Sequence, residues 1–394
     1  MRICILTTLH DADDDLVFYK YTRSLAKRYK DITVVAPESR RPQELETSTV
    51  EFRWLKASSS PMGRVLRLIQ AVGEVRRVSP DVCHFYDLDI VAIVPWLRRV
   101  CKIAPVYGAI EAWPERMLCA RKIPKCLRAP IAKITNMIEK RMARRCSLVV
   151  TADDATAADF EKRGIHTATL FNFPPLSLFE PEPPSFPEIQ HRYRGRTIGL
   201  YHGSMTEDRG LFHMLRATPL VVAQEGSFLL MLIGLRDGAL KRRATGLIRD
   251  LHIEKNVEII PWLPHTEIAA YIRTARVGLV PLQPIPKYYK NIPQKIFEYM
   301  ACGVPILGSN LPTIAPFLQE SGAGIVADCT QPELVAEGIL RILKDESESL
   351  KMSRNGRRAF LTQYNWEAME QRLFTIYDEL ARLVRLDQSR MAEG

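Results

Sequence analysis

Short, continuously apolar segments alternate with longer amphipathic segments along the chain, and the alternation occurs twice, on either side of a proline-rich stretch. Runs of Val, Ile and Leu without strict polar alternation are typical of strands buried on both faces of a parallel sheet. Parallel strands need long crossover connections, and the amphipathic segments have the length and pattern to provide them as helices. The pattern therefore predicts an α/β protein with two doubly wound domains.

The chain has 394 residues, which exceeds the usual size of one domain. Six prolines fall between Pro174 and Pro187, and proline opposes the interiors of both helices and strands. From Trp366 to about Arg385 the pattern predicts one long amphipathic helix. The predicted organisation is a domain over 1–172, a linker over 173–196, a second domain over 197–365 and a C-terminal helical segment over 366–394. Buried strands are predicted over 2–8, 31–37, 80–87, 104–110 and 147–152, and then over 197–204, 227–234, 256–264, 277–282, 304–310 and 323–328.

The beginning of the chain, "MRICILTTLHDADDD", has a short apolar run that leads into acidic residues, which does not match a signal peptide. No stretch approaches the ~20 apolar residues of a membrane-spanning helix. The eight cysteines form no C-x-x-C pair and no zinc-type cluster, which favours buried, reduced thiols. These observations predict a cytoplasmic protein without a bound metal.

Phosphate-binding fingerprints are absent from the sequence. The turn after the first predicted strand, "TTLHDADDD", contains no glycine, and no G-x-x-x-x-G-K-[ST] loop occurs anywhere. Nicotinamide-dinucleotide and P-loop nucleotide chemistry are therefore excluded as interpretations.

Two segments of the second domain have the composition of a phosphate site. In "YHGSMTEDRG", Gly203 permits close backbone approach and Arg209 adds a planar cation. In "KNIPQKIFEYMACGVPILGSN", Asn291 is a candidate helix cap, and a helix over 294–301 places Lys295 and Glu298 on one face. Phosphates would lie at Lys295 and the helix start, with a ribose at Glu298. On the residues alone, a solvated arginine turn and a surface Lys/Glu pair remain open.

These two segments resemble the retaining, nucleotide-sugar-dependent glycosyltransferases of the GT-B fold, the family often labelled group 1. "PQKIFEYMACGVPILGSN" is similar to the donor-site helix of that family, and "YHGSMTEDRG" to its diphosphate loop. In the first half, "LHDADDDLVFYKYTRSLAKRYKDITVVAP", "PVYGAIEAWPE" and "FNFP" are similar to a bacterial branch of polysaccharide-biosynthesis type. The resemblance covers nearly the whole chain, and it implies two Rossmann-like domains, an interdomain cleft and a C-terminal helix that returns to the first domain.

The resemblance also implies roles for residues of the second domain. Arg209 and Lys295 would neutralise the donor diphosphate, and Glu298 would bind the ribose. Gly203 and Ser204 would approach the phosphates, Trp262 and Leu263 would flank the base, and Asn291 belongs to the same donor site. Such enzymes use no metal and no cofactor beyond the sugar nucleotide itself.

Three positions depart from the family pattern. Lys290 stands where a carboxylate often lies near the donor sugar, and Ser204 stands where an arginine commonly follows the loop glycine. Ile110 replaces a histidine of the related branch. The donor sugar is therefore left open, Arg209 and Lys295 become the main phosphate charges, and an acceptor-side or catalytic group is missing.

On the acceptor side, candidate residues follow predicted strands of the first domain. Asp87 or Glu111 could take a proton from an acceptor hydroxyl, so both are catalytic candidates beside Arg209 and Lys295. Other acceptor-side candidates are His10, Asp14 and His84, and each histidine is equally compatible with a structural hydrogen bond. No catalytic base is assigned.

Positive charge is concentrated in residues 98–145, which contain 13 Lys/Arg and three Glu, equal to the net charge of +10 of the whole chain. Apolar residues interleave with the cations, a pattern that suits an anionic membrane surface. A solvated helix face is the alternative. Nucleic acid is disfavoured because few aromatics are available to stack on bases.

The sequence thus predicts a glycosyltransferase that moves a sugar from a nucleotide-diphosphate donor to an acceptor hydroxyl. The resemblance implies retention of anomeric configuration and a role in polysaccharide or glycolipid synthesis. The basic segment predicts peripheral attachment to the inner membrane face. The alternatives are a nucleotide-sugar epimerase on the same fold and a non-catalytic nucleotide-sugar-binding subunit. No motif specifies the sugar, the base or the acceptor.

Overall fold

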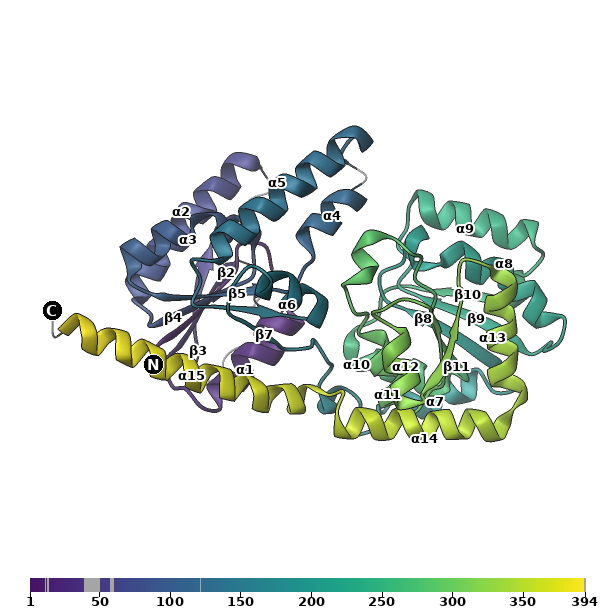
Figure 1. Cartoon of the computed structure of the whole chain (residues 1–394). Helices are drawn as coiled ribbons and strands as arrows, with labels where there is room; N and C mark the ends of the chain where they lie inside the picture. The colour runs from purple at the N-terminus through teal and green to yellow at the C-terminus, as the bar shows by residue number, and fades with distance from the viewer. Residues whose placement is uncertain (11, 13, 39–49, 57–59, 121, 393–394) are drawn as a thin grey trace. The chain divides into compact units, whose positions relative to one another are not determined.

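The computed structural model describes residues 1–10, 12, 14–38, 50–56, 60–120 and 122–392. The chain forms two compact units. Unit 1 comprises Met1–Asn172 and Met369–Gly394, and unit 2 comprises Phe173–Ala368. Each unit contains one parallel sheet, as the sequence predicts (Figure 1). No helix among the described residues is both long enough and apolar enough to cross a membrane.

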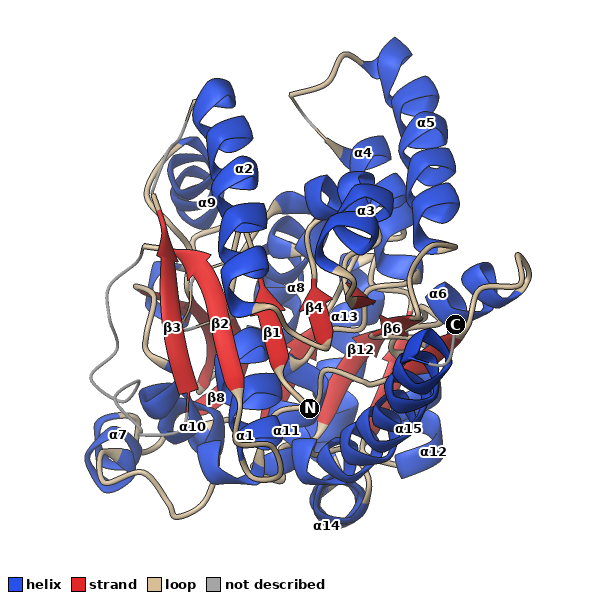
Figure 2. Ribbon diagram, turned by 90° about the vertical axis from the view of Figure 1, so that its left-hand side faces the viewer, coloured by secondary structure: helices blue, strands red, loops and turns tan. Residues whose placement is uncertain are grey.

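The sheet of unit 1 has seven parallel strands in the order β3-β2-β1-β4-β5-β6-β7, and β3, β2, β1 and β4 lie side by side in Figure 2. Its strands are β1 (Ile3–Leu6), β2 (Ile32–Pro37), β3 (Val50–Leu55), β4 (Val82–Phe85), β5 (Ala104–Ala109), β6 (Leu148–Thr151) and β7 (Thr167–Thr169). Its helices are η1 (Asp15–Thr22), α1 (Arg23–Ala26), α2 (Pro61–Val78), α3 (Leu88–Cys101), α4 (Trp113–Cys119), α5 (Lys125–Ala143), α6 (Asp154–Glu161) and the part of α15 (Trp366–Ala392) that starts at residue 369.

The two faces of this sheet are covered by different helices. Successive side chains of a strand point to opposite faces. Cys83 and Phe85 accordingly lie in the cluster formed with α2, α3 and α5. His84 points the other way, and its Nδ1 lies 2.7 Å from the Tyr377 hydroxyl of α15. Glu370 of α15 accepts hydrogen bonds from Ser24 and Lys27, so the C-terminal helix is bound to the rest of unit 1.

The sheet of unit 2 has six parallel strands in the order β10-β9-β8-β11-β12-β13. They are β8 (Thr197–His202), β9 (Phe228–Ile233), β10 (Val257–Ile260), β11 (Val277–Val280), β12 (Ile306–Ser309) and β13 (Gly324–Ala327). The α-helices are α7 (Phe186–Arg192), α8 (Leu211–Val222), α9 (Ala239–Asp250), α10 (His265–Thr274), α11 (Lys295–Ala301), α12 (Ala315–Ser321), α13 (Pro332–Lys344) and α14 (Glu346–Thr362). Short 3₁₀ turns are η3 (Leu176–Leu178), η4 (Glu207–Arg209), η5 (Glu254–Asn256) and η6 (Pro286–Tyr289).

Residues 173–196, which the sequence predicts as a linker, lie within unit 2. The ring of Phe173 packs edge-to-face on Phe297 with centroids 4.5 Å apart. The carbonyl of Pro174 accepts a hydrogen bond from the backbone N–H of Trp366. Apolar residues between the prolines therefore anchor this segment, although it contains little regular structure besides α7.

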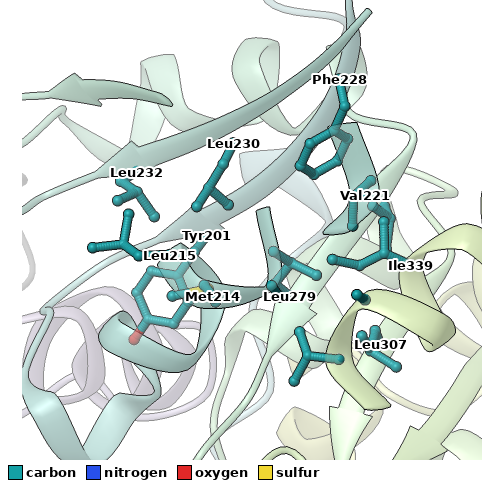
Figure 3. Close-up of a cluster of buried hydrophobic side chains, with 14 of the residues drawn as sticks. Tyr201, Met214, Leu215, Val221, Phe228, Leu230, Leu232, Leu279, Leu307 and Ile339 are labelled. Atoms are coloured by element: carbon teal, nitrogen blue, oxygen red, sulfur yellow. The ribbon is translucent and has the colours of Figure 1, made fainter. Parts of the chain in front are cut away.

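An apolar cluster lies between the sheet of unit 2 and helices α8 and α13 (Figure 3). Phe228, Leu230 and Leu232 of β9 point into it at every second position, and Leu215 of α8 packs against them. This cluster fixes β8 and β11, whose ends carry the candidate donor-site residues.

Truncating Leu215 tests this core, because Leu215 is 0% exposed whereas Leu220 of the same helix is 42% exposed. We expect Leu215→Ala to lower the free energy of unfolding by about 2–5 kcal/mol, since it leaves a cavity in a packed core. Leu220→Ala is the matched control and should change it by less than about 0.5 kcal/mol. Urea unfolding followed by circular dichroism measures both, and equal effects would contradict the placement of Leu215.

Candidate functional site

The strand order of unit 2 reverses between β8 and β11, which are neighbours in the sheet but not in the chain. Chain connections leave these two strands in opposite directions, and ligands of open α/β sheets bind outside the carboxyl ends of such a pair. Residues 203–210 follow β8 and residues 281–294 follow β11. The predicted phosphate loop and the entry to α11 therefore belong to the same switch point.

The loop after β8 is held in a conformation that favours glycine. Gly203 has φ +96°, and Gly234 at the end of β9 has φ +100°. A Cβ atom on Gly234 would lie 2.7 Å from the carbonyl oxygen of Gly203. The carbonyl of Ser204 accepts hydrogen bonds from the Tyr201 hydroxyl at 3.1 Å and from the Arg209 guanidinium at 3.0 Å. Arg209 is therefore hydrogen-bonded to the loop that is predicted to approach the phosphates.

Lys295 is 7% exposed and lies at the start of α11. Its Nζ donates a 2.6 Å hydrogen bond to the carbonyl of His202 and lies 3.4 Å from the centre of the Tyr201 ring. Burial, and secondarily the positive charge of Arg209, lower the pKa of the Lys295 amine well below its usual range. The structure thus brings two cations to one loop, where an anion would relieve their repulsion.

Glu298 follows Lys295 by one helical turn and is 5% exposed. Its carboxylate lies 3.2 Å from Nε2 of His202, a residue that is buried at the carboxyl end of β8. Lys295 and Glu298 thus share a face of α11, as predicted, and both contact the last residue of β8. The predicted solvent-exposed Lys/Glu pair is ruled out by this burial.

Trp262 and Leu263, the predicted base-side residues, line a small hollow of about 40 Å³ together with Gly203 and Gly234. Trp262 is 54% exposed, and the guanidinium of Arg236 lies 5.9 Å from the centre of its ring. An exposed aromatic face beside the glycine loop offers a surface on which a planar base can stack.

An ion-pair cluster joins the two loops of the switch point. Asp208 of η4 accepts a hydrogen bond from the Tyr288 hydroxyl and pairs with Lys287 of η6, both at 2.7 Å. Burial alone would raise the pKa of Asp208, but the hydrogen bonds from Lys287 and Tyr288 outweigh it and lower the pKa to about 2. The carboxylate thus stays ionised and holds the loop after β8 to the loop after β11.

The predicted capping role of Asn291 is wrong. The N-cap of α11 is Gln294, and no side chain caps the helix. Asn291 instead donates its backbone N–H to the carbonyl of Lys287, because it lies four residues before the first helical residue and belongs to the turn that follows η6. Its assignment to the donor site stays a prediction.

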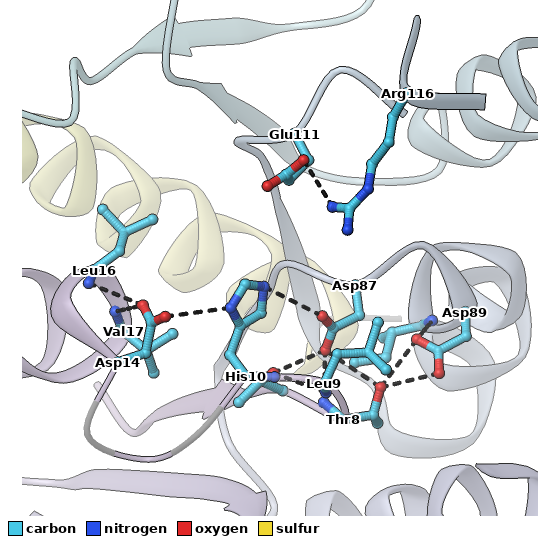
Figure 4. Close-up of polar contacts among 12 residues, drawn as sticks. Thr8, Leu9, His10, Asp14, Leu16, Val17, Asp87, Asp89, Glu111 and Arg116 are labelled. Atoms are coloured by element: carbon cyan, nitrogen blue, oxygen red, sulfur yellow. Dashed lines mark hydrogen bonds and ion pairs between the residues drawn. The ribbon is translucent and has the colours of Figure 1, made fainter. Parts of the chain in front are cut away.

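A second polar cluster occupies the switch point of unit 1, between β1 and β4 (Figure 4). His10 lies between two carboxylates: its Nδ1 is 3.4 Å from Asp14, and its Nε2 is 3.7 Å from Oδ1 of Asp87. Oδ2 of Asp87 accepts hydrogen bonds from the Thr7 hydroxyl and from the backbone N–H of Thr8. Three of the predicted acceptor-side residues are therefore brought together.

Protonation in this cluster follows from burial and from the His10 contacts. The hydrogen bond with Asp14 raises the pKa of His10. Burial opposes ionisation of Asp14, but the hydrogen bond from His10 prevails, and the pKa of Asp14 is lowered. Burial raises the pKa of Asp87, which is 0% exposed. His10 is partly exposed, so it can reach a ligand that the Asp87 carboxylate cannot touch directly.

Glu111 and His84 lie outside this cluster. Glu111 is partly exposed at the end of β5 and pairs with Arg116 of α4 at 2.9 Å (Figure 4). His84 is fully buried, and this burial lowers its pKa to about 3. Its hydrogen bond to Tyr377 makes it an attachment point for α15. The sequence left open whether His84 contacts a ligand or makes a structural hydrogen bond. The structure shows the structural hydrogen bond.

Residues 185–359 match the family model described as "Glycosyl transferases group 1". This segment of the chain is therefore similar to the group 1 glycosyltransferases. The matched range contains every predicted donor-site residue of unit 2. Among curated proteins, similarity extends to the amylovoran biosynthesis glycosyltransferase AmsK of Erwinia amylovora, with 26% identity over 45% of this chain and 43% of that protein. The phosphatidyl-myo-inositol mannosyltransferase of Mycobacterium leprae is 22% identical over 76% of this chain and 74% of its own.

This chain covers only part of the first two curated relatives. It spans 43% of the length of AmsK and 56% of the length of the MMP alpha-(1->4)-mannosyltransferase of Mycolicibacterium hassiacum. Solved structures are covered almost completely. Sucrose-phosphate synthase from Thermosynechococcus elongatus superposes with TM-score 0.78 and 18% identity over 97% of this chain and 99% of that one. Anabaena Alr3699/HepE, solved in complex with UDP-glucose, has TM-score 0.74 and 14% identity over 96% and 100%. At such low identity the likeness establishes the fold, which is GT-B.

Two residues of the candidate site were missed by sequence reasoning, although a signal was present for each. His202 is the last residue of a buried strand and directly precedes Gly203, a position at the carboxyl end of the sheet. Asp208 directly precedes Arg209 in the same loop. What could not be read locally is their partners, Glu298 and Lys287, which lie about 80 to 100 residues further along the chain.

The burial of Lys295 predicts a pH dependence of stability for the unliganded protein. Between the lowered pKa of the folded protein and the value near 10.4 of an unfolded chain, the unfolded state binds the extra proton. Stability should therefore rise with pH across this window, by up to about 1.4 kcal/mol per pH unit for one group. We expect the unfolding free energy of the wild type to increase relative to that of Lys295→Met between pH 7 and 10. Urea unfolding of both proteins measures this difference, and parallel pH curves would contradict it.

Proposed function

We propose that this protein transfers a glycosyl group from a nucleotide-diphosphate sugar to an acceptor hydroxyl. The observation that carries the proposal is the convergence of Lys295 and Arg209 on the glycine loop after β8, where the lysine is buried and its ammonium is destabilised. A diphosphate placed there supplies the missing negative charge. Perturbed ionisation of this kind is typical of functional sites.

In the proposed reaction, the bond between the anomeric carbon and the diphosphate oxygen breaks, and its electron pair remains on the diphosphate. The acceptor oxygen forms the new bond to that carbon and loses its proton. Arg209 and Lys295 stabilise the charge that develops on the leaving diphosphate. Metal independence is part of this proposal: the charge stabilisation is assigned to these two side chains.

Glu298 and the hollow at Trp262 complete the proposed donor site. Glu298, held by His202, accepts hydrogen bonds from ribose hydroxyls, and the exposed face of Trp262 stacks on the base. The names of similar proteins support this assignment. Anabaena Alr3699/HepE has been solved in complex with UDP-glucose, and two of the curated relatives are named mannosyltransferases.

On the acceptor side, we assign contact with the acceptor to His10 rather than to Asp87. Asp87 is buried and its Oδ1 faces His10, so it acts by positioning the imidazole. We propose retention of anomeric configuration and a role in polysaccharide or glycolipid assembly. Both follow from the resemblance to group 1 enzymes.

Substitution of the donor-site residues tests this function. We expect Arg209→Ala and Lys295→Met to reduce turnover about 10²–10³-fold, the usual cost of removing one group that stabilises transition-state charge. Glu298→Ala should weaken the binding of the nucleotide. The measurements are sugar-transfer assays over a panel of sugar nucleotides, together with calorimetric titration of the nucleoside diphosphates.

Lys255→Ala is the matched control, because Lys255 is an exposed lysine of the same unit. It should leave turnover and binding unchanged, and circular dichroism should confirm folding of every variant. Wild-type turnover in both Arg209→Ala and Lys295→Met would refute the site. Epimerised donor formed without acceptor would instead identify an epimerase, and nucleotide binding without donor consumption would identify a binding subunit.

We also propose that unit 1 binds an anionic membrane surface through α5. Leu127, Ile134 and Ile138 recur at intervals of seven and four residues, so they share one face of this helix, and all three are exposed. Lys133 and Arg141 are exposed beside them. A face that combines apolar side chains with cations matches the interface of an anionic bilayer. Arg121 of the basic segment lies outside the described residues.

Vesicle co-sedimentation tests the membrane proposal. We expect the wild type to bind anionic vesicles at least tenfold more strongly than neutral ones, since each nearby cation contributes about 1 kcal/mol. Ile134→Glu/Met137→Glu should abolish most of this binding, because it places carboxylates on the apolar face. Leu220→Glu is the control, since Leu220 is an exposed leucine of unit 2. Equal binding to neutral vesicles, or no binding to either, would overturn the proposal.

A further inference from the structure

Two adjoining hollows lie in unit 2 at the amino-terminal ends of its strands. One has a volume of about 780 Å³ and the other about 510 Å³, and both are lined by Arg273, Cys302, Gly303 and Ser353. The walls come from α7 and the start of β8, from the end of α10, from the turn between α11 and β12, and from α14. We call the combined hollow the arginine basin, after the seven arginines that line it: Arg194, Arg196, Arg273, Arg276, Arg354, Arg357 and Arg358.

The positive charge of the arginine basin is mostly uncompensated. None of the residues that line it is an aspartate or a glutamate. Arg357 pairs with Glu180, which lies outside the lining. Arg194 and Arg276 are exposed, and within the described part of the chain no ion pair or side-chain hydrogen bond involves them. Seven like charges around one hollow repel one another, and the binding of an anionic ligand would offset this repulsion.

Backbone carbonyls hold four of these guanidinium groups in place, and one of them is Arg357, which donates to the carbonyl of Ala301. Arg196 donates to the carbonyls of Phe228 and Lys255, and Arg273 donates to the carbonyl of Phe179. Arg354 donates to the carbonyl of Leu350 within α14. Neutral acceptors orient an arginine without cancelling its charge, so these contacts preorganise the basin for an anion rather than neutralise it.

The basin lies at the amino-terminal ends of the strands of unit 2, and the donor site lies at the carboxyl ends of the same strands. β8 runs from the basin, where Arg196 and Ile198 line the wall, to His202 at the donor site. α11 begins at Lys295 in the donor site, and the residues that follow its end, Cys302 and Gly303, line the basin. A ligand in the basin would therefore be separate from the sugar nucleotide.

We propose that the arginine basin is a second binding site, for a small ligand that carries two or more phosphate groups. Arginine forks match phosphate oxygens in bidentate geometry, and the volume is in the range of small-molecule sites. The lining contains two rings: Tyr193 is buried and donates its hydroxyl to Glu258, and the imidazole of His191 is exposed. Arginine is by far the most frequent charged residue of the lining, so the basin is built to recognise the phosphate groups. This inference is independent of the proposed donor chemistry.

Calorimetric titration of the full-length protein with inorganic tripolyphosphate, at fixed ionic strength, tests the site. We expect Arg194→Gln/Arg276→Gln to raise the dissociation constant at least tenfold, because two charge-assisted contacts are lost. Arg242→Gln/Arg249→Gln removes the same charge from exposed positions of α9 and should change it by less than twofold. Since Arg194 and Arg276 are exposed, both variants should unfold at the wild-type temperature.

The donor-site variant Arg209→Ala/Lys295→Met separates this inference from the proposed function. Tripolyphosphate should still bind to this variant, and substitution of Arg194 and Arg276 by glutamine should still weaken that binding. The inference is overturned if the wild type binds no tripolyphosphate, if both glutamine variants bind alike, or if Arg209→Ala/Lys295→Met alone abolishes binding. A donor site that fails its own test, with the basin still binding, would leave the basin proposal intact.

Discussion

A buried ammonium at the end of β8 is the constraint on which the candidate donor site depends. Removing the charge of Lys295 from water is costly, and the carbonyl of His202 and the face of Tyr201 offset only part of that cost. Arg209, fixed to the neighbouring carbonyl of Ser204, increases it. The fold holds both cations in place because β8 is anchored in the sheet and in the apolar cluster of unit 2, and because every residue of α11 is buried. Such a site is most stable when an anion occupies it, which is the property expected of a diphosphate-binding loop.

The two units place polar side chains at the same point of their sheets, but the residue types differ. In each, the strand order reverses at the first strand of the sheet, and polar side chains gather at the carboxyl ends of the reversing pair. In unit 2 these side chains are cations around a glycine loop. In unit 1 they are His10 and the carboxylates of Asp14 and Asp87 on either side of it. Asp87 is buried and accepts hydrogen bonds from Thr7 and Thr8. In the proposed function, the first site would hold the leaving phosphate and the second would contact the attacking hydroxyl.

The parallel strands were predictable where both of their faces are buried, because continuous apolar runs are then required. β3 and β7 were not predicted. β3 alternates Val, Glu, Phe, Arg, Trp and Leu and is partly exposed at the edge of the sheet, and β7 has only three residues. Proline content suggested a linker over 173–196, yet Phe173 and the carbonyl of Pro174 attach this segment to unit 2. Composition indicates where regular structure is absent, but it does not show whether a segment packs.

The sequence by itself determined the alternation of strands and helices, the two-domain class, the glycine loop and the shared face of Lys295 and Glu298. These depend on neighbours within a few residues, since periodicity and backbone conformation are local properties. Only the tertiary structure decided that Lys295 is buried against His202 and that Asp208 joins two loops through Lys287. It also decided that arginines of α10, of α14 and of the segment between α7 and β8 line one basin. Those contacts join residues that are far apart in the chain, and their burial, which sets their charge state, exists only once the sheet has assembled.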